Sequence, residues 1–422
     1  MKIMRAMKVM KVMNVMKSHE GHERQEGHEN HEDHESHEDH ESYELLKGKS
    51  NMAGDFLGKE IPKLGFGMMR LPMLGGKMDV EQSKKMVDLF IEHGYTYFDT
   101  AYVYTNSEET TKAALVDRHP RGRFQLASKL SAWAAKTAEE AAGQFWTSLK
   151  RTGVDYFDYF LLHNMGDKRT EAYDNFGVWE FLARQKEKGY IKHLGFSAHT
   201  NPADLDRILT KHPEMEFVQL QINYADWRNP MVESEKCYEI ALKHKKPVII
   251  MEPVRGGNLA DPPPKAAALL KEANPDASYA SWAIRFAASL DNVITVLSGM
   301  SNIEQVLDNL AVMDDFKPLD DSERTVIAKV QQILDEIPEI PCTACNYCLD
   351  GCPKGIAISL IFRAMNRYLV YGVLGKARSN YSWALENGSK GSECIACGKC
   401  EESCPQHIHI IEELEKTVAL LE

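Results

Sequence analysis

Eight of the nine cysteines stand in two runs of identical spacing near the C-terminus. Each run reads C-x2-C-x2-C-x3-C and is followed directly by proline. Gaps of two residues let one tight loop present thiolates to different corners of an iron–sulfur cube, and this spacing holds 4Fe–4S clusters in bacterial proteins. The pattern therefore predicts two 4Fe–4S clusters. Their candidate ligands are Cys342, Cys345, Cys348, Cys352, Cys394, Cys397, Cys400 and Cys404.

Zinc and disulfide bonds are the competing explanations of these cysteines. Zinc sites usually pair two C-x2-C units across a longer spacer, and disulfide frameworks are typical of small secreted chains. In two-cluster proteins the fourth cysteine of each run binds the other run's cluster. Here 41 residues separate Cys352 from Cys394, which leaves this crossing open. Cys237 stands alone on a helical pattern (233–244), and we interpret it as a small core residue.

Length and charge limit the classes of function. A chain of 422 residues has room for two or three domains. The net charge of −12 argues against a nucleic-acid partner, because phosphate contacts need basic surface. No apolar run is long enough to span a bilayer, so no membrane association is expected. Since the clusters need free thiolates, we expect a reducing compartment, the cytoplasm.

Residues 1–51 read as a low-complexity, disordered tail. The first 45 residues follow a period of three, which does not keep one helical face. Histidine alternates with glutamate in the second half, and such tracts can bind transition metals loosely. We favour a solvated, disordered tail because nothing defines a coordination geometry. The candidate ligands there are His28, His31, His34, His37 and His40, and Met52 is a candidate for the true start of the protein.

From residue 52 to residue 318 short apolar runs alternate with amphipathic helical stretches, and most recur at about thirty residues, the length of one βαβ unit. Eight such units predict an α/β fold, a closed (β/α)8 TIM barrel. An open doubly wound sheet is disfavoured because no G-x-G-x-x-G follows the first strand. A helix and linker (319–340) and a small, mostly helical ferredoxin-like domain (341–422) should follow. The expected strands are 63–69, 95–100, 124–129, 158–163, 191–197, 217–222, 247–252 and 293–298.

Ionisable residues end three consecutive strands of this predicted barrel. Asp99 ends the second strand, Lys129 the third and His163 the fourth, and Tyr104 follows Asp99 in the loop. Buried charges are costly unless they are paired, and chemistry in such barrels collects at the C-terminal ends of the strands. We therefore expect these four residues to form a catalytic site.

The order of these residues, with Gly65-Phe66-Gly67-Met68-Met69-Arg70 on the first strand and Asp99-Thr100-Ala101 on the second, resembles the aldo/keto reductase superfamily over residues 57–309. Together with the cysteine runs, the chain resembles the iron–sulfur branch of that superfamily. The resemblance implies hydride transfer between a nicotinamide cofactor and a small carbonyl or alcohol substrate. Tyr104 would donate a proton, Lys129 would lower the pKa of Tyr104, Asp99 would hold Lys129, and His163 would orient the carbonyl.

The resemblance also implies a set of contacts with NAD(H) or NADP(H). No lysine or arginine stands in the last loop to bind a 2′-phosphate, so that segment leans toward NAD without assigning it. The implied contact residues are Gly67, Met68, Ser197, Gln219, Met251, Pro253, Arg255, Gly256, Ser298, Gly299, Ser301, Gln305 and Asn309.

Two kinds of electron transfer meet in this chain. Clusters pass single electrons, whereas nicotinamide passes two as hydride. In one hypothesis the barrel is an NAD(P)-dependent oxidoreductase, and its clusters are structural or serve a redox partner protein. The alternative is an iron–sulfur electron-transfer protein whose barrel does not use nicotinamide. A third hypothesis, a metal-binding protein acting through the histidine tail, has the complete Asp–Tyr–Lys–His set against it.

Overall fold

The computed structural model describes residues 52–56, 59–229 and 232–422. The predictions of a disordered tail and of metal binding by its histidines concern residues 1–51 and lie outside the described residues. The described residues belong to one compact unit, which holds both the barrel and the cysteine-rich region.

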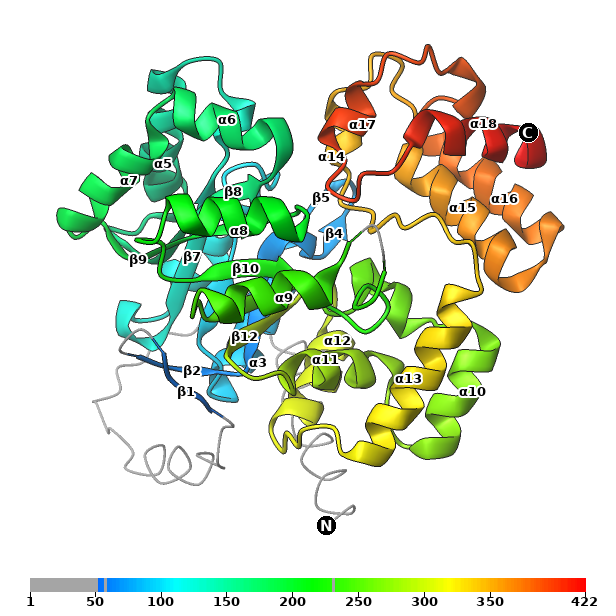
Figure 1. Cartoon of the computed structure of the whole chain (residues 1–422), viewed down its shortest axis with the longest axis horizontal. Coiled ribbons are helices and arrows are strands. Elements are labelled where there is room, and N and C mark those ends of the chain that lie inside the picture. The colour runs from blue at the N-terminus through cyan, green and yellow to red at the C-terminus, as the bar shows by residue number, and fades with distance from the viewer. Residues whose placement is uncertain (1–51, 57–58, 230–231) are drawn as a thin grey trace, which may run out of the picture. The chain divides into compact units, whose positions relative to one another are not determined.

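A closed barrel of eight parallel strands forms the centre of this unit (Figure 1). Around the barrel the order of the strands is β10-β11-β12-β3-β6-β7-β8-β9. Each strand matches one of the eight expected runs, so the predicted fold class is confirmed. The strands are β3 (Leu64–Gly67), β6 (Tyr97–Asp99), β7 (Gln125–Leu130), β8 (Phe157–Met165), β9 (Ile191–Ala198), β10 (Val218–Gln221), β11 (Val248–Met251) and β12 (Val293–Ser298).

Helices alternate with these strands, and local sequence signals set their ends. Asp79 accepts a hydrogen bond from the amide of Gln82 at 2.9 Å and thereby caps the first barrel helix. Gly153, with a φ of 71°, ends α5 in the left-handed conformation that glycine tolerates. The helices are α3 (Val80–Glu92), α4 (Ser107–Thr111), α5 (Ala138–Thr152), α6 (Asp167–Asn175), α7 (Val178–Glu187), α8 (Pro202–Lys211), α9 (Ser234–Lys243), α10 (Pro264–Ala273), α11 (Tyr279–Ala288) and α12 (Ile303–Met313).

Two hairpins that the sequence analysis did not expect accompany the barrel. The antiparallel pair β1 (Met52–Phe56) and β2 (Lys59–Pro62) precedes the first barrel strand, and β4 (Met73–Leu74) pairs with β5 (Lys77–Met78) after it. Apolar and aromatic side chains from several strands fill the inside of the barrel. The barrel is therefore a packed core, and chemistry is restricted to its rim. This core consists of Ile61, Tyr97, Ala127, Tyr159, Leu161, Phe217, Ile249, Ile294 and Leu297.

Helix α13 (Asp321–Asp335) follows the barrel, and Ile327 and Val330 on α13 share a buried cluster with Leu270 of α10. The cysteine-rich region is mostly helical (Figure 1). Its helices pack around Ile361, Phe362 and other apolar residues. None of the described helices is long and apolar enough to cross a membrane. The helices of this region are α14 (Tyr347–Asp350), α15 (Ile358–Tyr371), α16 (Leu374–Ala384), α17 (Lys399–Ser403) and α18 (Ile410–Leu421).

Candidate active site and cysteine loops

The four predicted catalytic residues meet at one end of the barrel. Asp99 is the last residue of β6, and Lys129 and His163 come from the neighbouring strands β7 and β8. The Lys129 ammonium is bonded to Asp99 Oδ1 and donates to the Thr100 carbonyl at 2.8 Å. Lys129 Nζ lies 5.1 Å from the ring centre of Tyr104, and the Tyr104 and His163 rings are 5.5 Å apart. The predicted convergence of these four residues is therefore present in the structure.

Burial dominates the electrostatics of this group. It raises the pKa of Asp99 and lowers that of Lys129, and each partner's charge opposes the shift of the other. Burial, followed by the neighbouring phenol of Tyr347, raises the pKa of Tyr104 well above its ordinary value. The net pKa of Tyr104 therefore lies above its ordinary value, and the expected effect of Lys129 on it stays a prediction. The Tyr104 phenol is protonated at neutral pH.

His163 is held as a neutral imidazole. Burial lowers its pKa well below 6.5, and the charge of Lys129 adds to that shift. Its Nδ1 is 2.9 Å from the hydroxyl oxygen of Ser131, and its carbonyl accepts from Trp133 Nε1 at 3.2 Å. When the Ser131 hydroxyl donates to Nδ1, the proton of the neutral ring is on Nε2. The contact between Ser131 and His163 was not expected from the sequence, although Ser131 stands two residues after Lys129.

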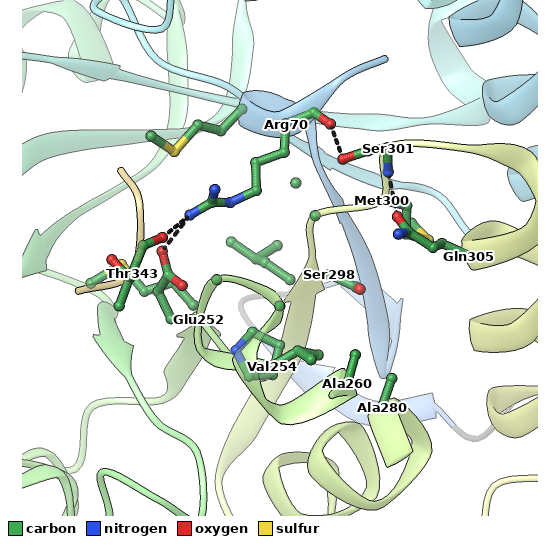
Figure 2. A pocket seen from close by; sticks show the side chains of 18 of the residues that line it. Arg70, Glu252, Val254, Ala260, Ala280, Ser298, Met300, Ser301, Gln305 and Thr343 are labelled. Atoms are coloured by element: carbon green, nitrogen blue, oxygen red, sulfur yellow. Dashed lines mark hydrogen bonds and ion pairs between the residues drawn. The ribbon is translucent and has the colours of Figure 1, made fainter. Parts of the chain in front are cut away.

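A cavity of about 530 Å³ opens beside these residues. Figure 2 shows part of its lining, around Arg70, Ser301 and Thr343. Asp99, Tyr104 and His163 line the cavity, together with most of the residues that the resemblance implied for the nucleotide. A cavity of this size is in the range of small-molecule and cofactor sites. The implied contact residues that line it are Gly67, Gln219, Met251, Pro253, Gly256, Ser298, Gly299, Ser301, Gln305 and Asn309.

Three implied contact residues do not line this cavity. Met68 is fully buried, and its carbonyl accepts from Ser107 Oγ at 2.9 Å. Ser197 Oγ accepts from the amide of Asn164 at 2.8 Å. Arg255 forms ion pairs with two acidic side chains, one of them Glu339 at 3.4 Å. The polar groups of these three residues are engaged in contacts inside the protein. Sequence spacing alone could not reveal these contacts.

The end of the cavity near β12 and α12 suits a nucleotide. Gln305 Oε1 accepts from the Ser301 amide at 2.7 Å, and Ser301 Oγ donates to the Arg70 carbonyl at 2.7 Å, as Figure 2 shows. Gln219, which would face the nicotinamide ring, has a buried Oε1 without a hydrogen-bond partner among the described residues. A carboxamide could donate to that oxygen. The residues present therefore fit a dinucleotide with a nicotinamide end.

Charged groups at this end include one cation that the sequence analysis missed. Lys271 lines the cavity, but its ammonium already donates to the carbonyls of Ala277 at 2.8 Å and Pro275 at 3.1 Å. Glu304 and Asp308 line the same end. These carboxylates would repel an additional phosphate.

The opposite wall of the cavity comes from the loops that carry the two cysteine runs. They are called the first cysteine loop, at residues 342–352, and the second cysteine loop, which ends at Cys404 and the residues directly after it. Arg70 on the barrel donates from Nη2 to the Thr343 carbonyl at 2.6 Å and pairs with Glu252 at 3.5 Å (Figure 2). A Cβ added to Gly256, whose φ is +64°, would lie 2.3 Å from the same Thr343 oxygen. The barrel and the first cysteine loop thus touch backbone to backbone. The wall residues from these loops are Thr343, Cys345, Tyr347, Pro405 and Gln406.

The second cysteine loop touches the barrel through a pair of buried amides. Gln406 Nε2 donates to Gln221 Oε1 at 2.8 Å, and Gln221 Nε2 donates back at 3.0 Å. Gln221 ends β10, and Gln406 follows Cys404 by two residues. Both cysteine loops are therefore part of the barrel mouth. From the sequence, these loops were expected to belong to a separate domain (341–422).

The cysteines sort into two groups that exchange their fourth members. Cys352 lines a small cavity with Cys394, Cys397 and Cys400. Burial raises the pKa values of Cys342, Cys345 and Cys348, and the nearby thiol of Cys404 raises them further. No three histidine, cysteine or acidic side chains in the described ranges converge closely enough to hold a single metal ion. The other group comprises Cys342, Cys345, Cys348 and Cys404.

Cys237 takes no part in these groups. It is buried on α9, and its thiol donates to the Thr200 carbonyl at 3.4 Å. This position agrees with the interpretation of Cys237 as a core residue.

Both regions of the chain match known protein families. A model of the aldo/keto reductase family matches residues 63–332, and a model of a 4Fe-4S dicluster domain matches residues 341–409. An aldo-keto reductase of Mycolicibacterium smegmatis is 26% identical over 267 residues, which cover 60% of this chain and 89% of that protein.

Two solved structures share the barrel. The holo form of an aldo-keto reductase from Bacillus halodurans is 24% identical, with a TM-score of 0.53 over 67% of this chain and 94% of that one. An aldo/keto reductase from Klebsiella pneumoniae in complex with NADP and acetate is 22% identical, with a TM-score of 0.54 over 65% of this chain and 93% of that one. At these identities the likeness shows the fold alone. Because the first family model spans more than half of the 422 residues, the protein belongs to the aldo/keto reductase family, and it carries a C-terminal 4Fe–4S dicluster domain.

Proposed function

We propose that the protein is a nicotinamide-dependent oxidoreductase that interconverts a small carbonyl compound and its alcohol. The observation that carries this proposal is the shared cavity. Tyr104, His163 and Asp99 line the same space as Gln219 and the segment from Ser298 to Asn309. Proton donor and nucleotide-binding residues can therefore reach one bound substrate together.

Each side chain has a role in this proposal that follows from its surroundings. A reduced nicotinamide, held by Gln219 and residues between Ser298 and Asn309, would supply hydride to the carbonyl carbon. Tyr104, protonated at neutral pH, gives its proton to the substrate oxygen. The neutral His163 ring donates from Nε2 to the same oxygen and orients the carbonyl. Lys129, held by Asp99, stabilises the phenolate that Tyr104 leaves behind.

We further propose that the cofactor is NAD(H) in preference to NADP(H). Glu304 and Asp308 would repel a 2′-phosphate, and Lys271 is already bonded to two carbonyls. The Klebsiella pneumoniae structure contains NADP, but its likeness to this chain concerns the fold. Fluorescence titration should give a lower Kd for NADH than for NADPH. A lower Kd for NADPH would overturn this preference.

For the dicluster domain we propose two 4Fe–4S clusters with crossed ligands. One would be bound by the first three cysteines of the first run and Cys404, and the other by the first three of the second run and Cys352. The clusters supply one-electron transfer when bound, and a redox partner protein is their expected electron source or acceptor.

A second candidate function rests on Cys345. This predicted cluster ligand lines the same cavity as Asp99, Tyr104 and His163, which together with Lys129 form the proposed catalytic tetrad. A molecule in the cavity would therefore lie against the first cluster. In this alternative the barrel binds an electron acceptor or donor without nicotinamide chemistry, and the protein is an electron-transfer module.

The test of the main proposal combines three measurements on anaerobically purified protein. Iron and sulfide analysis should give two 4Fe–4S clusters, and a fluorescence titration should show binding of NADH. Tyr104→Phe should lower kcat for aldehyde reduction by about 100- to 10,000-fold while leaving the Kd of NADH unchanged. Tyr102→Phe, two residues away and outside the cavity lining, is the matched control. Full activity of Tyr104→Phe, or no binding of either nicotinamide, would refute the proposal.

A further inference from the structure

Tyr347 lies inside the catalytic centre although it belongs to the dicluster domain. It stands between two predicted cluster ligands, Cys345 and Cys348, and is the first residue of α14. Its ring centre is 6.3 Å from that of His163 and 6.2 Å from that of Trp133. One aromatic side chain thus connects a cysteine loop with the tetrad.

The phenol groups of Tyr347 and Tyr104 are hydrogen-bond partners. The Tyr104 hydroxyl is therefore already engaged by another hydroxyl before any substrate is bound. A general acid must lie within hydrogen-bond reach of the atom that it protonates. A substrate oxygen must consequently take the position that the Tyr347 hydroxyl now holds.

Contacts on both sides fix the loop that carries Tyr347. Arg70 donates to the carbonyls of Thr343 at 2.6 Å and Ala344 at 3.3 Å from the barrel side. Asn346, in the left-handed region with a φ of 67°, accepts from Ser359 Oγ of α15 at 2.6 Å. The backbone is anchored, so only the Tyr347 side chain is free to give way to a substrate.

We propose that Tyr347 is a specificity-determining residue that the dicluster domain supplies to the barrel. Its hydroxyl holds the place of the substrate oxygen, and its ring forms the wall of the substrate half of the cavity. A carbonyl compound enters by displacing this side chain, which favours small substrates. Because Cys345 lines the same cavity, a substrate that displaces the Tyr347 ring also changes the surroundings of that thiol. This inference rests on the proposed carbonyl chemistry for its substrate class.

Two substitutions separate the hydroxyl from the ring. Tyr347→Phe removes the competing hydrogen bond, so KM for propanal should fall about two- to tenfold while kcat changes little. Tyr347→Ala also removes the wall, so kcat/KM for the bulkier 4-nitrobenzaldehyde should rise relative to that for propanal. Tyr371→Phe is the matched control, because Tyr371 also bonds a barrel residue, Asp261 at 3.3 Å, away from the cavity. Tyr371→Phe should change neither the KM for propanal nor the relative kcat/KM of the two aldehydes.

Readouts other than turnover keep this inference separate from the proposed reaction. Trp133 lies beside Tyr347, so its fluorescence should report binding of either aldehyde, with a lower Kd in Tyr347→Phe. In the dithionite-reduced holoprotein, propanal should shift the EPR signal of one cluster, and Tyr347→Ala should abolish the shift. If the wild type bound neither NADH nor NADPH, the proposed function would be refuted, whereas the aldehyde-binding measurements would still test the role of Tyr347.

Three outcomes would overturn the role of Tyr347. The first is an unchanged or higher Kd and KM for propanal in Tyr347→Phe. The second is a loss of kcat as large as that of Tyr104→Phe, which would make Tyr347 part of the proton-transfer machinery. The third is wild-type protein whose fluorescence and EPR signals respond to neither aldehyde.

Discussion

Replacing Lys129 with methionine tests the buried ion pair beneath Tyr104. Lys129 is fully buried, and Asp99 is only 3% exposed. The substitution keeps an unbranched side chain of similar length but removes the cation that is bonded to Asp99 Oδ1. Asp99 Oδ2 has no hydrogen-bond partner among the described residues even in the wild type. The variant therefore leaves a buried carboxylate without its main stabilising contact.

Two routes limit how much the free energy of unfolding can fall. Leaving one member of a buried pair charged and alone costs about 3–5 kcal/mol. Asp99 can instead take up a proton, which costs about 1.4 kcal/mol for each pH unit above its ordinary pKa near 3.9, or about 4 kcal/mol at pH 7. The cheaper route sets the loss. We expect the variant to be destabilised by about 3–4 kcal/mol at pH 7.

The same reasoning predicts the pH dependence of the variant. Without Lys129, the pKa of Asp99 in the folded state lies above its value in the unfolded state. The folded state then binds more protons, so the variant regains stability as the pH falls from 8 to 6, by up to about 3 kcal/mol. Asp99→Asn combined with Lys129→Met removes the charge and should remove this dependence.

Thermal unfolding of anaerobic holoprotein provides the assay. The difference in Tm between wild type and Lys129→Met should be larger at pH 8 than at pH 6, whereas the double variant should differ from wild type by a constant amount. Equal losses at both pH values, or a Tm of Lys129→Met equal to that of wild type, would refute a buried and charged Asp99–Lys129 pair.

Three further predictions concern the histidine, the cluster ligands and the contact between the two domains. Because His163 is neutral in the folded protein, protonation of a histidine should not lower wild-type kcat/KM as the pH falls from 8 to 6. A fall in activity below a pKa near 6.5 that His163→Gln abolishes would contradict this. Cys404→Ser and Cys352→Ser should each disturb the EPR signal of the cluster whose other ligands lie in the opposite run, and disturbance of the cluster of their own run would rule out the crossing. Gly256→Ala should lower Tm more than Gly257→Ala, because both glycines have positive φ but only Gly256 faces backbone at 2.3 Å; equal effects would show that this close contact does not matter.

Periodic features of the sequence predicted the barrel well. The eight apolar runs recur at the spacing of βαβ units, and the positions of Asp99, Lys129 and His163 at the ends of neighbouring strands follow from strand order alone. The cysteine spacing matched a dicluster domain. These features depend on local sequence, so they can be recognised without knowing which distant segments touch in the fold.

Contacts between distant segments were not predictable in the same way. Tyr347 and Tyr104 are far apart in the chain, and nothing in the spacing of the cysteines places a phenol beside the tetrad. Burial and the phenol of Tyr347 raise the pKa of Tyr104, and neither can be recognised from the positions of Tyr104 and Lys129 in the sequence. Ser131 stood close to Lys129 in the sequence, but only the fold reveals that it faces His163.

The source of the hydrogen added to carbon tests the central claim most directly. Single-turnover reduction of propanal with NADH deuterated at the transferring C4 position should give propanol with deuterium at C1 in the wild type. Tyr104→Phe should bind the same NADH and give almost no product. Propanol that forms without deuterium, taking its hydrogen from solvent, would contradict hydride transfer and favour reduction by electrons from the clusters.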